Sequence, residues 1–275
     1  MVEFQAKTYP LKFLLFITLT ATHYPMRQKN NITTGVVQKQ HVLTPYQGVA
    51  YGAPVLALHF LVIPATAILQ GIYATHFGLA LSTIATVLLM ARLFDAVSDP
   101  LIGYFSDRYY AHRGNRNPFI IAGALLFIIS SWFLYVPFGI DPQQQGTHVS
   151  GGYFLVWFLA FYLAYTLIEI PHLALGSEVV SDSQGKSKVY GIRSFFHYLG
   201  TLLFFSMPLL PWFEGNEFTP QTLKWSVLIA GSLMLPMVYL CIKAVPNRSR
   251  LSPVASSDCR PLQKDSLRVV LRAIF

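Results

Sequence analysis

Charged residues are scarce in this chain of 275 residues, where Asp, Glu, Lys and Arg together make up 12 %. An ordinary soluble domain carries about 25 %, so a soluble enzyme is excluded, as is a disordered chain that depends on charge. Two cysteines are too few for a disulfide framework, and no Cys/His spacing resembles a zinc site. Apolar residues are abundant at 53 %, with a mean hydropathy of +0.47. These values predict a polytopic membrane protein with little material outside the bilayer.

Motifs for enzymatic chemistry are also missing from the sequence. There is no nucleophile and base pair, no phosphate-binding loop and no metalloprotease motif. We therefore expect that the chain is not an enzyme and uses no cofactor.

Long apolar runs predict an all-α fold of six transmembrane helices, because crossing the hydrocarbon takes about 20 apolar residues. The runs are much too long for barrel strands and lack their strict alternation. They cover residues 53–75, 80–105, 118–138, 152–175, 191–212 and 225–245.

Loop charges predict the orientation of these helices. Arg and Lys follow the second, fourth and sixth runs, whereas the opposite loops carry mostly acids, such as Asp141 and Glu214. We therefore expect a multi-pass protein of the inner (plasma) membrane with both termini in the cytoplasm. The lipid bilayer then accounts for the net charge of +8, and no nucleic-acid partner is needed.

The two ends of the chain differ from the bundle that we expect over residues 46–246. Residues 1–45 hold one apolar run, 11–21, which is too short to span. It is either a signal-peptide core or a sign of a misplaced start, with Met26 as the true one, and we favour the latter. The basic tail, 247–275, ends in an alternating apolar and basic stretch. That stretch suits an amphipathic helix on the cytoplasmic membrane surface or an ordinary linker.

Charges at membrane depth are costly, so each needs an explanation. Arg92, Asp95 and Asp99 are spaced i, i+3 and i+7, on one face of the second span. Two carboxylates one turn apart repel each other unless Arg92, a proton or a metal cation joins them. Carboxylate oxygens are hard ligands of the kind that Na⁺ prefers. The alternative is a static ion pair between Arg92 and one aspartate.

Further polar residues lie in the fourth and fifth spans. Thr166 and Glu169, at i and i+3, could complete an oxygen cage with the two aspartates, although a threonine bonded to its own helix is the simpler interpretation. Arg193 could extend to the membrane surface or reach Glu169 or a substrate hydroxyl. Three histidines also lie at membrane depth, where a histidine more often packs helices by hydrogen bonding than binds a ligand. They are His59, His172 and His197.

The second span and its exit loop read RLFDAVSDPLIGYFSDRYYAHRGNRNP. This stretch resembles the signature of the melibiose-permease group, the glycoside–pentoside–hexuronide:cation symporters of the major facilitator superfamily. The segments YTLIEIPHLALGSE and RSFFHYLG are similar to that family's fourth and fifth helices. The resemblance covers the chain from about Tyr46 to its end.

The resemblance implies a cation site formed by Asp95 and Asp99, with Thr166 as a possible helper and the aspartates as Na⁺ ligands if the coupling ion is sodium. It implies that Glu169 serves cation and sugar together and that Arg193 hydrogen-bonds the sugar. It also implies a cytoplasmic loop motif that latches helix ends together. That motif comprises Gly103, Asp107, Arg108, Gly114 and Arg116.

Two departures from the family bear on function. Where its sugar transporters have an acidic sugar-binding residue in the first helix, this chain has His59, so a neutral sugar, a uronic acid and a different solute all remain open. The family has twelve helices in two bundles. We therefore expect this chain to be the N-terminal six-helix half, with 247–275 as the start of the inter-bundle loop. Its partner would be the missing C-terminal half or a second copy.

The predicted function is thus cation-coupled (Na⁺ or H⁺) secondary transport of a sugar or sugar-like solute. The alternative is a truncated or non-transporting membrane fragment, which acts as an assembly partner or has no function.

Overall fold

The computed structural model describes residues 44–137, 148–180, 183–211 and 217–245. By its internal contacts the chain divides into two units, 1–39 and 40–275. The predictions for the N-terminal extension up to residue 43 and for the basic tail lie outside the described residues.

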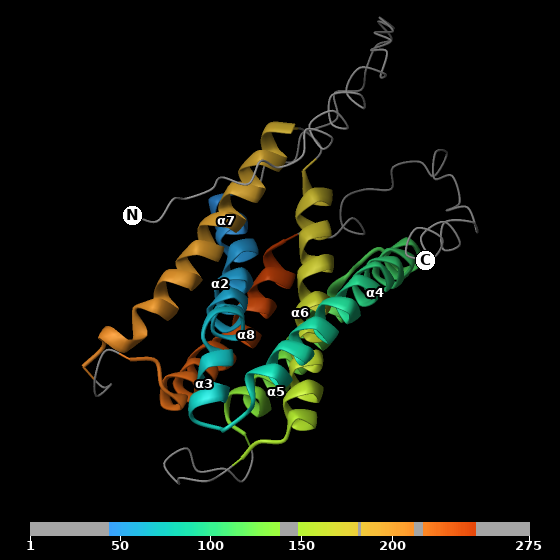
Figure 1. The fold of residues 1–275 in the computed structure, drawn as a ribbon. Helices are drawn as coiled ribbons and strands as arrows, with labels where there is room; N and C mark the ends of the chain where they lie inside the picture. Colours follow the sequence, from blue (N-terminus) through green and yellow to red (C-terminus); the bar gives the residue numbers. More distant parts are fainter. Residues whose placement is uncertain (1–43, 138–147, 181–182, 212–216, 246–275) are drawn as a thin grey trace, which may run out of the picture. The chain divides into compact units, whose positions relative to one another are not determined.

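The described residues form helices without any strand (Figure 1), which confirms the all-α prediction. The helices are α2 (Pro45–Ala67), α3 (Leu69–Thr75), α4 (Leu81–Arg113), α5 (Asn117–Tyr135), α6 (Gly151–Val179), α7 (Ser183–Phe205), the 3₁₀ turn η1 (Met207–Leu209) and α8 (Pro220–Ala244). The first predicted run, 53–75, corresponds to two helices because the α-helix is interrupted at Ile68.

Five of these helices are long and apolar enough to cross a membrane, namely α2, α4, α5, α6 and α8. At about 1.5 Å per residue, the 23 residues of α7 also give enough length. Its hydropathy is lower because Lys186, Lys188, Arg193 and His197 interrupt its apolar residues. The chain is therefore a multi-pass membrane protein, and the sixth span stays a prediction.

Local sequence signals set the helix ends. Thr44 caps α2 and Thr219 caps α8, each in a capping box in which the cap and the third helical residue hydrogen-bond reciprocally. Proline follows both caps in the first turn, where its missing N–H costs nothing. Gly114 ends α4 with a φ of 71°, a left-handed conformation that other residues rarely adopt.

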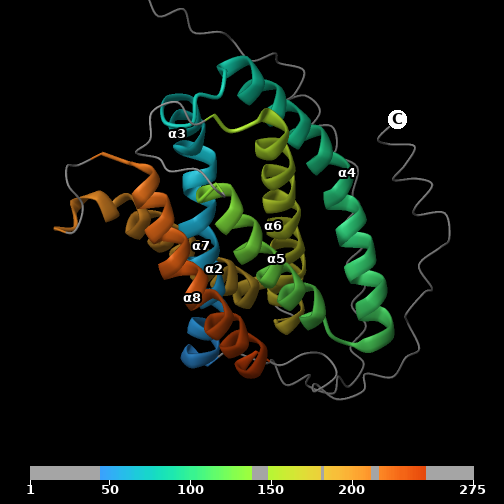
Figure 2. The same ribbon diagram turned by 90° about the horizontal axis from the view of Figure 1, so that it is seen from below.

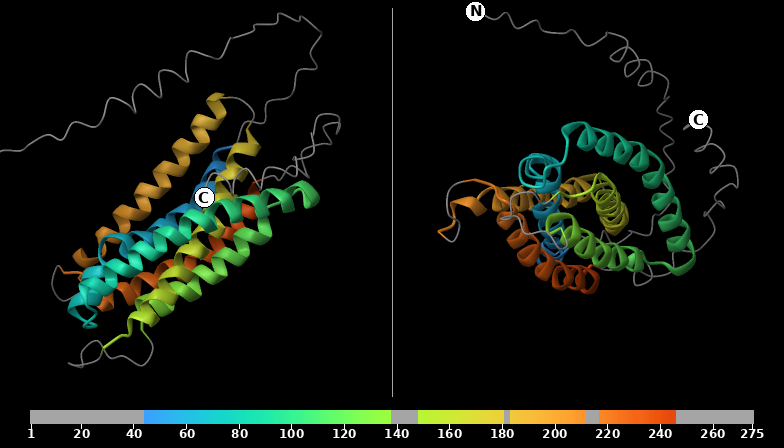
Figure 3. Two further views of the ribbon diagram at one scale, coloured as in Figure 1. Left: turned by 45° about the vertical axis from the view of Figure 1, so that its right-hand side comes forward. Right: turned by 60° about the horizontal axis from the view of Figure 1, so that its bottom comes forward.

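The bundle can be followed from neighbour to neighbour in the order α4, α6, α5, α8, α2 and α7. Figure 2 shows α4 at one edge beside α6, and the right-hand view in Figure 3 shows α6 inside the curve of α4 and next to α5. Most of the apolar part of α2 is buried, whereas most of that of α4 is exposed. The apolar core therefore lies around α2, and α4 packs mainly on α6.

Two glycines let α2 and α7 approach closely. A Cβ atom at Gly200 would overlap the backbone carbonyl of Leu56, and one at Gly52 would overlap the ring of Phe196. Small residues are common at such contacts in membranes because they allow backbones to meet. This packing brings the Arg193 side of α7 toward α2 and α6.

We expect Gly200→Ala to destabilise the bundle by about 1–3 kcal/mol, the usual cost of overpacking, because the Leu56 backbone cannot move aside cheaply. Gly191→Ala is the matched control on the same helix, because a Cβ atom at Gly191 would meet nothing within 4 Å. Thermal unfolding in detergent compares the two. Equal stability of both variants would contradict the close approach of the helices.

Candidate functional site: intramembrane carboxylates and a buried loop arginine

A hydrogen bond between α4 and α6 joins two of the predicted cation ligands. The Thr166 hydroxyl donates to a carboxylate oxygen of Asp99 at 2.9 Å. It also lies 3.0 Å from the carbonyl of Tyr162, one turn back on α6. The single hydroxyl proton is shared between these acceptors, so the inter-helix contact and the simpler helix-bonded interpretation hold together.

Asp95, one turn before Asp99, is only loosely paired. Its Oδ2 lies 3.6 Å from Arg92, whose side chain is 69 % exposed and also lies over the ring of Tyr162. The other carboxylate oxygen of Asp95 is buried and has no hydrogen-bond partner among the described residues. A long ion pair to an exposed arginine therefore leaves half of this carboxylate free to bind something else.

Glu169 on α6 and Arg193 on α7 form an ion pair in which the arginine is buried and the Glu169 side chain is 23 % exposed. Of the two alternatives for Arg193, the structure has the inward one, since the side chain is buried rather than extended to the surface. The second carboxylate oxygen of Glu169 is buried without a hydrogen-bond partner in the described part of the chain. This oxygen is a free acceptor beside a guanidinium donor, an arrangement suited to hydroxyl groups.

The oxygen cage of three carboxylates is not assembled in this conformation. Among the described residues between 44 and 245, no three His, Cys, Asp or Glu side chains are close enough to hold one metal ion. The groups that the structure does bring together are Asp99 with Thr166, and Glu169 with Arg193. A Na⁺ ion at Asp95 and Asp99 would therefore take its remaining ligands from hydroxyl or water oxygens.

His59 lies on α2, buried, with its Nδ1 3.0 Å from the carbonyl of Val55 on the same helix. Its ring packs against His197 of α7, with centroids 3.8 Å apart, and meets the edge of Tyr165 of α6 at 6.4 Å. Three helices thus contribute rings to one cluster. Because Nδ1 faces a carbonyl, which can only accept, it carries the proton, and Nε2 is left as an acceptor.

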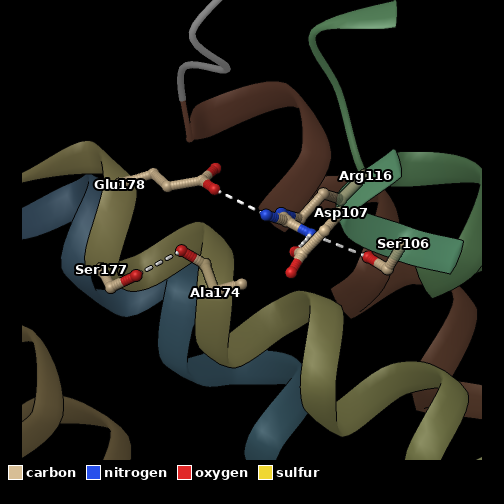
Figure 4. Close-up of polar contacts among 6 residues, drawn as sticks. All are labelled: Ser106, Asp107, Arg116, Ala174, Ser177 and Glu178. Carbon is tan, nitrogen blue, oxygen red and sulfur yellow. Dashed lines mark hydrogen bonds and ion pairs between the residues drawn. The ribbon is translucent and has the colours of Figure 1, made fainter. Parts of the chain in front are cut away.

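The predicted loop motif is centred on Arg116, directly before α5 (Figure 4). Its guanidinium donates to Asp107 at 2.7 Å and to Ser106 at 2.9 Å, both near the end of α4. A third bond, at 2.7 Å, reaches Glu178 at the end of α6. Burial alone would lower the pKa of Arg116, but the hydrogen bonds to Glu178 and Asp107 outweigh it and raise the pKa above its ordinary value. Arg116 thus joins two helix ends.

The other predicted motif residues do not share this contact. Arg108 is exposed and hydrogen-bonds the hydroxyl of Tyr104 at 3.1 Å on its own helix. Gly114 provides the left-handed end of α4, and a Cβ atom at Gly103 would meet Ile170 at an ordinary 3.9 Å. Glu178 was missed as a site residue, although it ends the segment YTLIEIPHLALGSE that carried part of the resemblance.

Residues 50–271 match the family model described as MFS/sugar transport protein. The chain belongs to this family. The resemblance to glycoside and cation symporters of the major facilitator superfamily is thereby confirmed, and because the family consists of transporters, so is the prediction that the chain is not an enzyme.

Related symporters agree with this assignment. The inner membrane symporter YicJ of Escherichia coli is 26 % identical over 86 % of this chain and 52 % of its own length. The putative glycoside/cation symporter YagG of the same organism is 29 % identical over 58 % of this chain and 34 % of its own length. The isoprimeverose transporter of Lactiplantibacillus pentosus is 24 % identical over 73 % of this chain and 41 % of its own length. The chain thus spans about half or less of the length of these relatives.

Proposed function

We propose that this chain is the N-terminal six-helix half of a cation-coupled symporter for a sugar or sugar-like solute. It would lie in the inner membrane with both termini cytoplasmic. The observation that carries the proposal is a pair of unpartnered carboxylate oxygens, on Asp95 and Glu169, buried at membrane depth among the described residues. Such groups are costly in a membrane unless they bind a ligand during the working cycle.

The cation side of the site rests on Asp95, Asp99 and Thr166. A Na⁺ ion or a proton placed between the two carboxylates would remove their mutual repulsion and satisfy the free oxygen of Asp95. The Thr166 hydroxyl would then turn its oxygen toward the ion and its proton toward the carbonyl of Tyr162. Either ion fits this scheme, and the test below distinguishes them.

The sugar side rests on Glu169, Arg193 and the ring cluster of His59. The free Glu169 oxygen accepts from one sugar hydroxyl, and the Arg193 guanidinium donates to another. The buried His59 ring would support the partly exposed His197 ring, which suits the apolar face of a pyranose. Among the relatives, names include an isoprimeverose transporter and a glucuronide carrier protein homolog, so isoprimeverose and a glucuronide are the first solutes to test.

Coupling follows if the cation and the sugar both favour one conformation. Neutralising Asp95 and Asp99 lowers the cost of enclosing them and leaves Glu169 free to hold the sugar. The substrate of such transporters lies between two bundles. The second bundle would come from a C-terminal half or from a second copy of this chain.

We expect Glu169→Gln to weaken sugar binding at least tenfold, because the amide leaves Arg193 without its charged partner inside the membrane. Isothermal titration of the protein in nanodiscs with isoprimeverose and methyl glucuronide measures this effect, in Na⁺ and in choline buffers at several pH values. Glu217→Gln, the same change at an exposed residue before α8, is the control for the loss of one negative charge. Sugar affinity that is the same in every buffer and in the variant would contradict the proposal.

A further inference from the structure

His172 lies directly behind the ion pair of Glu169 and Arg193. It follows Glu169 by three residues on α6, so both side chains face α7, and it is only 2 % exposed. Its Nδ1 lies 2.6 Å from a terminal nitrogen of Arg193, and its Nε2 lies 3.0 Å from the carbonyl oxygen of Tyr51 on α2. The imidazole also stacks on the Tyr51 ring, with centroids 4.4 Å apart and planes inclined by 11°.

These two contacts fix the protonation of the ring, and Cys241 Sγ, 3.8 Å from Nε2, agrees with them as a weak acceptor. A guanidinium can only donate, so Nδ1 must be an unprotonated acceptor. A carbonyl can only accept, so Nε2 must carry the proton. One neutral tautomer, with hydrogen on Nε2 alone, satisfies both neighbours, whereas an imidazolium would direct an N–H at the N–H of Arg193.

Two residues one turn apart on α6 thus hold the guanidinium of Arg193, which also interacts with the side chain of Tyr51. One side meets the carboxylate of Glu169, and the other meets the imidazole of His172. The Tyr51 hydroxyl donates to the carbonyl of His172 at 3.2 Å, which ties the same turn of α6 to α2. A long arginine with one anchor could rotate away or extend toward the membrane surface, whereas two anchors fix its plane.

We propose that His172 is the positioning residue of the sugar site, a neutral acceptor in the Nε2–H tautomer that orients Arg193 toward Glu169 and the substrate. The inference rests on the proposed function for its effect on sugar. Its structural part, the tautomer and the bond to Arg193, stands separately.

Nitrogen-15 NMR of histidine-labelled protein in nanodiscs tests the structural part without any ligand. The resonances of His172, assigned by their loss in His172→Asn, should show a pyridine-type Nδ1 and a pyrrole-type Nε2. A protonated Nδ1, either in the other tautomer or in an imidazolium, overturns the inference.

Two substitutions test the effect on sugar. His172→Phe keeps a ring that can stack on Tyr51 but removes the acceptor, whereas the side-chain oxygen of His172→Asn takes the place of Nδ1. We expect the Kd for isoprimeverose or methyl glucuronide to rise about tenfold or more in the Phe variant. In the Asn variant it should stay within about threefold, and Na⁺ affinity without sugar should be unchanged in both.

A role confined to packing would give the reverse order, with Phe tolerated and Asn impaired in both sugar affinity and thermal stability. That order would overturn the inference. If the unaltered protein binds neither sugar in any buffer, the proposed function fails, and the NMR result alone decides the assignment of His172.

Discussion

Asp99→Asn is expected to abolish uphill, cation-driven solute uptake. The amide lacks the negative charge that would hold a cation together with Asp95, and it turns the acceptor of the Thr166 hydroxyl into a group that does not titrate. The variant should still equilibrate the solute down its gradient, because Glu169 and Arg193 are untouched. Membrane vesicles that contain either the Asp99→Asn variant or the unaltered protein are supplied with isoprimeverose. Uphill uptake is measured with a Na⁺ or H⁺ gradient, and downhill equilibration is measured without one.

Thr166 offers graded controls for this experiment. Thr166→Ser keeps the hydroxyl, so its cation affinity should match that of the unaltered protein. Thr166→Val keeps the shape but loses the oxygen that would turn toward the ion, so cation affinity should weaken about tenfold or more. Undiminished accumulation by the Asp99 variant would disprove coupling at this site.

Arg116→Ala is expected to destabilise the protein by about 3 kcal/mol, the lower end of the cost of breaking a buried ion pair. The variant leaves Glu178 and Asp107 without their shared donor and opens the join between the ends of α4 and α6. The lower end applies because the Asp107 side chain is 58 % exposed, so water replaces part of what it loses.

Arg108→Ala is the matched control for this prediction, being the same change in the same motif. Its side chain is exposed and bonds only one tyrosine hydroxyl in the contacts described above, so we expect a loss within about 0.5 kcal/mol. Urea or thermal unfolding of both variants in the same detergent gives the comparison. Similar losses in the two variants would show that the loop motif acts through its charge and not through the buried contact.

Much of the fold could be predicted because crossing a bilayer imposes a simple rule on sequence. The runs now seen as α4, α5, α6 and α8 were recognisable from length and hydropathy alone. Hydropathy identifies a membrane helix less clearly where the helix carries polar site residues. This is so in α7, because Arg193 and His197 lower its hydropathy. Hydropathy also could not show the break at Ile68, which depends on local backbone geometry.

The site was only partly predictable, for a related reason. Spacing along one helix placed Asp95 near Asp99, and Thr166 near Glu169, but it carries no information on distances between helices. Two arginines of one motif, at 108 and 116, look alike in the sequence, and only the fold makes one of them buried. His172 was interpreted as a packing residue because its partners are 21 and 121 residues away.

The neighbour order of the helices has a consequence for how the protein is made. α2 leaves the ribosome first among the described helices, yet its main neighbours, α7 and α8, are completed only near residues 205 and 244. Helix association in lipid depends on contact with a partner, because the lipid tails are as apolar as the side chains. Until α7 is made, Gly52, Leu56 and His59 of α2 therefore lack the α7 residues that they contact in the finished fold. Among the described helices, α2 is the most deeply buried span, and it is the first to be made and among the last to complete its packing.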